Sequence, residues 1–281
     1  PKDEKLKNKR LTTEDQKTRS SKAKDSKKGG MPVKTTEIMK DLFSLAYKQD
    51  FDHTCDTCKA GDPETDVTKV AVTMFATPEV IRQAAKWGAQ LLITNEPTYH
   101  TIPEDTFSSD KVDTEKRTLL EGAGMVLFRF HDHPHYTSPD IISAGELEKM
   151  GLEGALEYTD IFDCVRIHLK TPMTPVELAR SIERRLGIRH VRICGARDLP
   201  CQVVSGMFGA PGNIVLEELQ RPESQIVLVG ETCEWLIGEY ARDAAQLGLK
   251  KALLIMGHVG SERDGMEYTA RLLKERHPQL D

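Results

Sequence analysis

The chain has 281 residues and a formal net charge of −5 at pH 7, and 38% of its residues are hydrophobic. This length suits one large or two small domains, and no apolar stretch approaches the length that a membrane-spanning helix needs. The composition excludes a membrane protein and favours a soluble protein, which we expect in the cytoplasm.

The first part of the chain differs in composition from the rest. Residues 1–30 contain eleven Lys and Arg against five Asp and Glu, and no aromatic residue. We expect them to be a disordered expression-vector leader, with Met31 as the natural start. A native basic arm that binds nucleic acid is the alternative. Residues 31–281 alone carry −11, which argues against nucleic acid as the main partner because phosphate binding needs a basic surface.

Hydrophobic periodicity predicts alternating helices and strands over the first half of the remaining chain. Thr77 and Pro78 are typical of a helix start, and Gly88 is typical of a helix end. The predicted strands are Val67–Phe75, Leu91–Thr94 and Met125–Phe130, and the predicted helices are 35–48, 78–87, 113–121 and 139–150.

The alternation continues in the second half, which predicts an α/β protein. The predicted strands are Phe162–Leu169, Val191–Cys194, Val203–Met207, Gln225–Val229 and Ala252–Met256, and the predicted helices are 174–186, 214–219, 233–247 and one beginning near His258 or Ser261. We expect one domain from residues 31–150 plus 222–281, with 151–221 forming an inserted or interlaced second α/β domain.

Six cysteines are scattered along the chain, which fits reduced thiols better than a disulfide framework. The pair Cys55-x-x-Cys58 admits a zinc or redox site. No second pair follows at zinc-finger spacing, so we favour two loop cysteines without a metal.

Potential metal ligands follow four of the predicted strands. Five of the nine histidines lie there, together with five carboxylates. Because the carboxyl ends of parallel strands meet at one edge of a sheet, we expect these side chains to converge. The four segments are Leu91–His100, Phe128–His135, Val227–Glu234 and Gly257–Glu262.

The last segment carries the clearest chemical signal. His258 and Glu262 are four residues apart where a helix should begin, so both lie on one helical face. Imidazole and carboxylate together suit zinc or another transition metal. Taken singly, each histidine could be a structural residue, and Glu231 and Glu234 could be acids favoured by the helix dipole. Their convergence favours a metal or catalytic site.

The turn that contains Gly206, Gly209 and Gly212 could hold a phosphate through its backbone N–H groups. It lacks the Lys and Ser/Thr of a Walker motif and the spacing of a dinucleotide fingerprint. A simple turn is the alternative.

These motifs together resemble a known family. Over residues 35–280, the ordered set resembles the Nif-three-like family, whose members are also described as dinuclear-metal-centre hexameric proteins or as type-two GTP cyclohydrolase I. The resemblance implies two interlaced α/β domains with mixed sheets flanked by helices, and a homohexameric ring with paired metals facing an internal cavity. The motifs are Thr94–Pro97, His131–His135, the glycine turn, Gly230–Glu231 and Gly257–Glu262.

The resemblance also implies a set of metal ligands. Asn95 falls where the family has a histidine, and its neutral amide is a poor ligand for a transition metal. We expect one or two divalent ions (Zn, Fe, Mn, Co or Ni) per subunit. The expected ligands are Glu96, His135, His258 and Glu262.

The function that these features favour is metal-dependent hydrolysis of a nucleotide-like or other small substrate. His131 or Asp132 would move protons, and Glu231 is a candidate base. A non-enzymatic metal-binding ring that serves as a scaffold for partners is the alternative.

Overall fold

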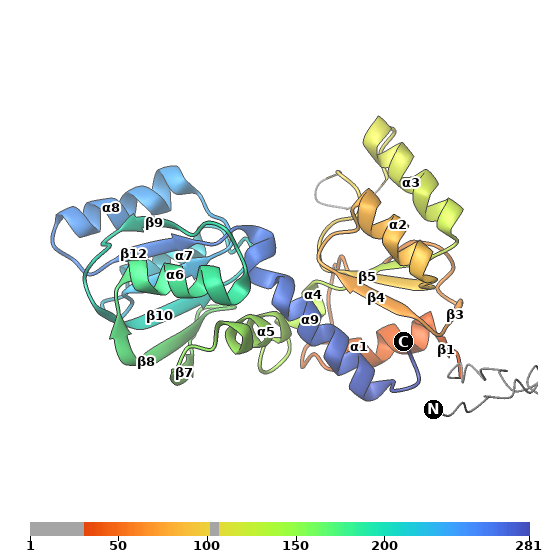
Figure 1. Ribbon diagram of the computed structural model, residues 1–281, viewed down its shortest axis with the longest axis horizontal. Coiled ribbons are helices and arrows are strands. Elements are labelled where there is room, and N and C mark those ends of the chain that lie inside the picture. Colours follow the sequence, from red (N-terminus) through yellow and green to blue (C-terminus); the bar gives the residue numbers. More distant parts are fainter. Residues whose placement is uncertain (1–30, 102–106) are drawn as a thin grey trace, which may run out of the picture. The chain divides into compact units, whose positions relative to one another are not determined.

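The computed structural model describes residues 31–101 and 107–281, in which two mixed β-sheets are flanked by helices (Figure 1). This arrangement confirms the predicted α/β fold class. The predicted leader, residues 1–30, lies outside the described residues.

The strands of the described residues form two main sheets and one short pair. The strands are β1 (Val33–Lys34), β2 (Cys58–Ala60), β3 (Asp66–Val67), β4 (Val70–Thr73), β5 (Leu91–Thr94), β6 (Val126–Arg129), β7 (Gly154–Tyr158), β8 (Val165–Met173), β9 (Arg192–Gly195), β10 (Cys201–Met207), β11 (Ile226–Val229) and β12 (Ala252–Ile255). The larger sheet has the order β7-β8-β10-β11-β12-β9, and the smaller sheet has the order β2-β6-β5-β4. Strands β10, β11 and β12 are parallel, as are β4, β5 and β6, and every other pairing is antiparallel.

Helices connect most of these strands. They are α1 (Thr35–Phe43), α2 (Pro78–Trp87), α3 (Lys111–Ala123), α4 (Asp132–His135), α5 (Ile141–Met150), α6 (Pro175–Leu186), α7 (Ile214–Gln220), α8 (Glu239–Gln246) and α9 (His258–Arg276). A π-helical turn over Glu234–Gly238 leads into α8.

Where local end signals are strong, the predicted boundaries are confirmed. Helix α2 has the predicted span: the Thr77 hydroxyl accepts the Val80 N–H at 3.2 Å, and Gly88 takes the left-handed conformation that ends the helix. Thr174 forms a capping box with Glu177 at the start of α6.

Where local sequence signals are weaker, the predicted elements differ from the observed ones. Helix α3 runs through Gly122, and Gly124 ends it in the left-handed conformation. A glycine inside a helix costs only about 1 kcal/mol, so it does not have to stop one. Strand β7 was not predicted because all five of its residues are exposed, and such an edge strand has no buried face to produce an alternating pattern.

The strands after residue 222 join the larger sheet. Strand β11 lies between β10 and β12. In sheet membership, 226–255 therefore groups with 154–207, whereas α9 packs against the smaller sheet. The predicted domain boundaries themselves stay a prediction.

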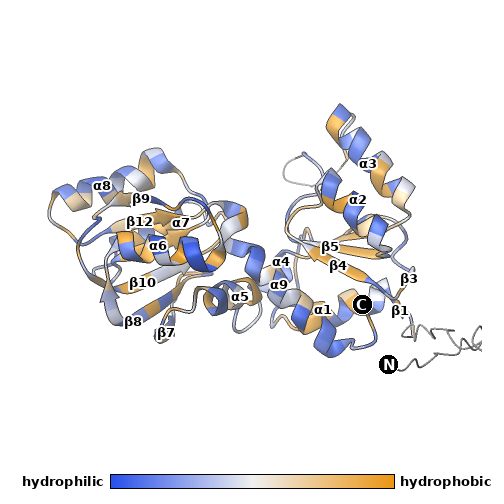
Figure 2. Cartoon of the chain, in the orientation of Figure 1, coloured by the Kyte–Doolittle hydropathy of each residue, from blue (hydrophilic) through white to orange (hydrophobic). Residues whose placement is uncertain are grey.

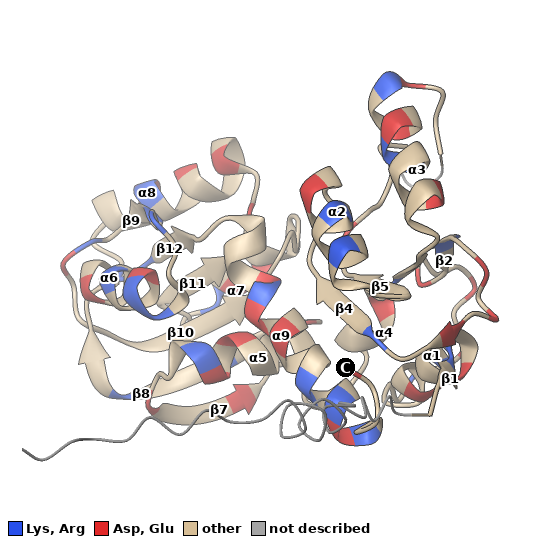
Figure 3. Ribbon diagram, turned by 45° about the vertical axis from the view of Figure 1, so that its right-hand side comes forward, with Lys and Arg blue, Asp and Glu red and all other residues tan. Residues whose placement is uncertain are grey.

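The sheets are held by apolar side chains on both faces. Every residue of β5, β6, β11 and β12 is buried. Strands β5 and β12 appear as apolar bands in Figure 2. Charged residues gather on the helices, whereas β4, β5, β10 and β11 carry none (Figure 3). No helix in the described ranges is both long and apolar enough to cross a membrane.

Helix α9 connects the two cores. It begins directly after β12, and its later residues Met266 and Leu273 pack with Leu91 and Phe128 of the smaller sheet. Its middle crosses α5 in close contact. A methyl group on Gly265 would lie 2.5 Å from the Ile142 Cα atom. The two backbones therefore touch at a distance that only glycine allows.

The same crossing buries a carboxyl group. Glu146 of α5 is fully buried; its Oε1 accepts the Asp264 N–H at 2.8 Å, and its Oε2 has no hydrogen-bond partner among the described residues. Burial raises the pKa of Glu146 to about 8, and the negative charge of Asp264 acts in the same direction.

We expect Gly265→Ala to lower the free energy of unfolding by about 2–3 kcal/mol, because the new methyl group meets backbone atoms that cannot rotate away. Urea unfolding would measure the change. The matched control is Gly122→Ala, also within a helix but with open space around it. That change should stabilise the protein by roughly 0.5–1 kcal/mol. Equal stability of the Gly265→Ala protein and the wild type would contradict the close crossing.

We expect Glu146→Gln to remove a pH dependence of stability. The folded protein raises the pKa of Glu146 from its ordinary value of 4.5 to about 8 and so favours the neutral carboxyl. This preference stabilises the fold fully below pH 4.5, and the stabilisation is lost as the pH rises through about 8. The variant should therefore gain on the order of 2 kcal/mol relative to wild type at pH 9 and little at pH 5. Urea unfolding at both pH values, in the presence of a chelator, would measure this difference in the free energy of unfolding. The control Glu148→Gln on the same helix removes an exposed ion pair with Arg271. The Glu148 carboxylate is charged at both pH values, so the effect of this change should be the same at pH 5 and pH 9. A gain for Glu146→Gln that is equal at both pH values would contradict the assignment.

Candidate metal centre

The four strand ends predicted to converge belong to two different sheets. Strands β5 and β6 lie in the smaller sheet, and β11 and β12 lie in the larger one. The expectation of one common sheet edge was therefore wrong. The segments still meet, because α9 follows β12 and its first turn lies against the residues that follow β5.

Three of the predicted metal ligands come together at this junction. His258 Nε2 lies 2.8 Å from Glu96 Oε1 and 3.1 Å from Glu262 Oε2. One potential ligand atom from each residue lies within 4.8 Å of the other two. Glu96 and Glu262 are buried, whereas His258 is partly exposed. The group therefore has an open side through His258.

Electrostatics make this group a site for a positive charge. Hydrogen bonds with Glu262 and Glu96 raise the pKa of His258 to about 11 against the opposing effect of burial. Burial acts to raise the pKa of Glu96, but the hydrogen bond with His258 and its charge lower it overall. Without a metal, the proton on His258 offsets the charges of two buried carboxylates.

Asn95 contacts the centre through its amide nitrogen. It is fully buried, and its Nδ2 donates a hydrogen bond to Glu262 Oε2 at 3.4 Å. Its Oδ1 has no hydrogen-bond partner among the described residues. Asn95 thus orients a carboxylate of the centre and leaves one acceptor atom unused.

Arg129, at the end of β6, supports the same loop. Its Nε donates to the Asn95 carbonyl oxygen at 2.9 Å, and its guanidinium lies 3.9 Å from Glu96 Oε2. This buried cation fixes the backbone of the β5 loop and faces the oxygen of Glu96 that His258 does not contact.

The glycine-rich turn packs against the start of α9. The Gly209 N–H donates to the Ser261 hydroxyl at 3.0 Å, and that hydroxyl donates to the His258 carbonyl oxygen. A Cβ atom on Gly209 would collide with the Glu262 carboxylate. The turn therefore makes room for Glu262, and the Gly209 N–H is already bonded within the protein rather than available to a phosphate.

Glu231, the predicted base, lies on the outer side of His258. Its Oε1 is 3.3 Å from His258 Nδ1, and its side chain is 59% exposed. A carboxylate on the second ring nitrogen orients the imidazole, as is common for histidine ligands. The role of Glu231 in catalysis stays a prediction.

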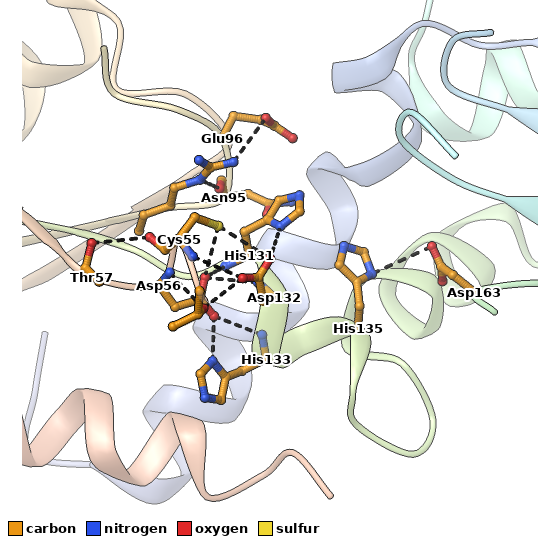
Figure 4. A network of polar contacts seen from close by, with 12 residues as sticks. Cys55, Asp56, Thr57, Asn95, Glu96, His131, Asp132, His133, His135 and Asp163 are labelled. Atoms are coloured by element: carbon orange, nitrogen blue, oxygen red, sulfur yellow. Dashed lines mark hydrogen bonds and ion pairs between the residues drawn. The ribbon is translucent and has the colours of Figure 1, made fainter. Parts of the chain in front are cut away.

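His135, the fourth predicted ligand, belongs to a separate group. Its Nδ1 lies 2.9 Å from Asp140 Oδ2 and 3.7 Å from Asp163 Oδ2, and the pair with Asp163 is visible in Figure 4. Burial acts to lower the pKa of His135, but Asp140, Asp163 and Glu262 raise it to about 10. His135 is therefore electrostatically linked to the centre without lying within its group of ligand atoms.

His131 and Asp132 form a third group with Cys55 (Figure 4). His131 Nδ1 lies 2.9 Å from Asp132 Oδ1, and the Cys55 thiol lies 3.4 Å from the same oxygen. The rings of His131 and His135 are edge-on with centroids 5.2 Å apart, so the third group is next to the second.

Several residues in these groups were not found from the sequence. Asp140 and Asp163 hold His135, Arg129 holds the β5 loop, and Asp56 accepts the backbone N–H groups of three residues, 131 to 133. The prediction placed Asp140 inside the helix 139–150, whereas it caps α5, which begins at Ile141. The others have no local signal, because their partners lie far away in the sequence.

Comparison with known proteins places residues 33–281 in one family. A family model described as Duf34/NIF3 (NGG1p interacting factor 3) matches residues 33–281. A relative from Clostridium perfringens (strain 13 / Type A), named GTP cyclohydrolase 1 type 2 homolog, is 23% identical over 249 residues, covering 85% of this chain and 89% of the relative. A protein of the same name from Clostridium acetobutylicum is 20% identical over 232 residues, covering 80% and 82%.

Solved structures show the same fold. The protein ybgI, described as of unknown function, has a TM-score of 0.71 and 21% identity, covering 89% of this chain and 96% of that one. A Bacillus cereus protein related to NIF3 has a TM-score of 0.70 and 13% identity, with the same coverage. At these identities, the structures support the fold alone.

We expect Gly209→Ala to disturb the centre more than Gly212→Ala. Both glycines have a left-handed backbone, so each change costs roughly 1 kcal/mol of stability. Only at Gly209 does the methyl group displace Glu262, which should bring the loss to roughly 2–4 kcal/mol and should lower the raised pKa of His258. Urea unfolding and an NMR titration of His258 in metal-free protein would measure both effects. Matching results for the two variants would contradict the close approach of Gly209 to Glu262.

Proposed function

Because this chain belongs to the Duf34/NIF3 family, we propose that it binds a divalent transition metal through Glu96, His258 and Glu262 and hydrolyses a nucleotide-like or other small substrate. The observation that supports the proposal is the convergence of these three side chains from the loop after β5 and from the start of α9, which follow strands of two different sheets. The name shared by the two clostridial relatives agrees with a hydrolytic reaction on a nucleotide.

The donor set fits such an ion. Imidazole nitrogen and carboxylate oxygen are both ligand types that bind zinc, and they also suit Fe, Mn, Co and Ni. In the metal-free protein, His258 Nε2 carries a proton and faces Glu96 and Glu262. A metal ion bound by the same three side chains would take the place of this proton, so metal binding would release it. The unused Oδ1 of buried Asn95 is a further oxygen close to the centre.

Several residues of the chain would then have separate roles around the ion. When bound, the ion supplies a Lewis acid for hydrolysis near neutral pH. Asn95 orients Glu262, and Gly209 leaves space for that carboxylate. Glu231 is the exposed carboxylate beside His258, where it can orient the ring and accept a proton from an attacking water.

Assembly into a homohexamer with sites facing an internal cavity is part of the same proposal and rests on the family resemblance. Occupancy by one or two ions per subunit is also part of it. His135 would join the centre only if its ring turned away from Asp140.

A non-enzymatic metal-binding scaffold is the second candidate function. The observation that favours it is Asn95, which donates a hydrogen bond to Glu262 in place of the ligand that a histidine would provide. A centre with fewer nitrogen ligands would hold a metal without the paired ions that the family resemblance implies.

We expect elemental analysis of protein purified without chelators or a metal-affinity step to find a transition metal that the His258→Ala, Glu262→Ala double variant does not bind at this centre. The loss follows because two of three ligands are removed. The matched control is His168→Ala, Glu157→Ala, which removes an exposed histidine–carboxylate pair 2.6 Å apart. Phosphoesters and nucleotides should be hydrolysed by the wild type and the control but not by the double variant.

Equal metal content in the wild type and the double variant, after reconstitution with Zn²⁺, Mn²⁺ or Fe²⁺, would overturn the metal centre. Metal binding without hydrolysis of any tested substrate would favour the scaffold. Within the same experiment, Asn95→His should raise the metal content per subunit. No change in metal content or activity in that variant would count against the idea that the centre lacks a ligand because Asn95 stands in place of a histidine.

A further inference from the structure

We propose that Cys55, His131 and Asp132 form a second metal site, separate from Glu96, His258 and Glu262 and selective for a thiol-binding ion such as Zn²⁺. One ligand atom from each of the three residues lies within 4.8 Å of the other two. Asp132 Oδ1 is central, at 2.9 Å from His131 Nδ1 and 3.4 Å from Cys55 Sγ.

The donor chemistry differs from that of the first centre. A thiolate is a soft ligand, and sulfur, imidazole nitrogen and carboxylate oxygen together are typical of zinc. Two anionic ligands balance the charge of one divalent cation. Three protein ligands leave a fourth tetrahedral position, as in catalytic zinc sites. All three residues are partly exposed, which leaves a path for an ion to enter.

Asp132 is held so that one oxygen faces the other two ligands. Its Oδ2 accepts the Thr54 hydroxyl at 2.7 Å and the Cys55 N–H at 3.1 Å. The Oδ1 atom is thereby directed toward His131 and Cys55. Hydrogen bonds of this kind to a ligating carboxylate are a regular feature of metal sites, because they fix its orientation.

The backbone around the site is tied together as well. The Asp56 carboxylate accepts the N–H groups of His131, Asp132 and His133 at 2.6–2.9 Å. Its Oδ2 is also 2.6 Å from His133 Nδ1. One loop, residues 54–56, therefore contributes a ligand and also holds the turn that carries the other two (Figure 4).

The neighbouring cysteine does not take part. Cys58 Sγ lies 3.2 Å from the Ala60 carbonyl oxygen, at the start of β2, and is not in the ligand group. The Cys55-x-x-Cys58 pair is thus divided between a metal site and a strand. In this proposal, His131 and Asp132 are ligands of an ion and do not have the proton-transfer role that the sequence predicts for them.

Titration of the metal-free protein with Co²⁺ would test the site, because a thiolate bound to Co²⁺ gives a charge-transfer absorption that nitrogen and oxygen ligands do not. We expect this absorption in the wild type, and we expect Cys55→Ser and Asp132→Asn to weaken Co²⁺ binding at this site by roughly 100-fold or more. Cys58→Ser is the matched control and should keep the absorption.

The His258→Ala, Glu262→Ala variant separates this proposal from the first centre, because that centre contains no sulfur. The absorption should persist in this variant. Its loss there would show that Cys55 belongs to the same centre and would overturn a separate site. Absence of the absorption in the wild type, or its removal by Cys58→Ser, would also overturn it.

A second measurement covers variants that fail to fold. Zn²⁺ should slow alkylation of Cys55 in the wild type by at least tenfold and should leave alkylation of Cys58 unchanged, as followed by mass spectrometry of the two cysteines. Equal protection of both thiols, or of neither, would contradict the proposal.

Discussion

The close crossing of α5 and α9 is the contact on which the rest of the structure depends. Gly145 and Gly265 bring the two backbones together, and this position sets the path of α9 from the larger sheet into the core of the smaller one. The first turn of α9 carries His258 and Glu262, so a change in that path would move both ligands away from Glu96. Packing about one helical turn beyond Glu262 therefore controls the geometry of the centre.

Charge balance explains why this junction suits a cation. Glu96 and Glu262 are buried where the loop after β5 meets α9, and the partly exposed His258 contacts both. Two buried carboxylates that share one imidazole are costly without a proton or a metal between them. The same pattern recurs around His135, where Asp140 and Asp163 flank a half-buried ring. Both groups hold a positive charge in the metal-free protein.

The first centre and the group at Cys55 differ in the atoms that they offer to a metal ion. The donors of the first are oxygen and nitrogen only, whereas the group at Cys55 adds sulfur. Asp56 and Thr54 keep the Cys55 group in place from one short loop. Ligands with different softness select different ions, so two neighbouring sites of this kind need not compete for one metal.

The sequence by itself determined the features that depend on neighbouring residues. Thr77, Pro78 and Gly88 define a helix through contacts within one turn, and His258 and Glu262 share a helical face by their spacing alone. The α/β class and three converging ligands followed from such local patterns and from the family resemblance. Sheet membership, the space left by Gly209 and the placement of Cys55 beside Asp132 were decided only by the tertiary structure. Each depends on residues that are at least fifty positions apart, or on which sheet a strand joins. Packing between distant segments, which no local periodicity encodes, settles such contacts.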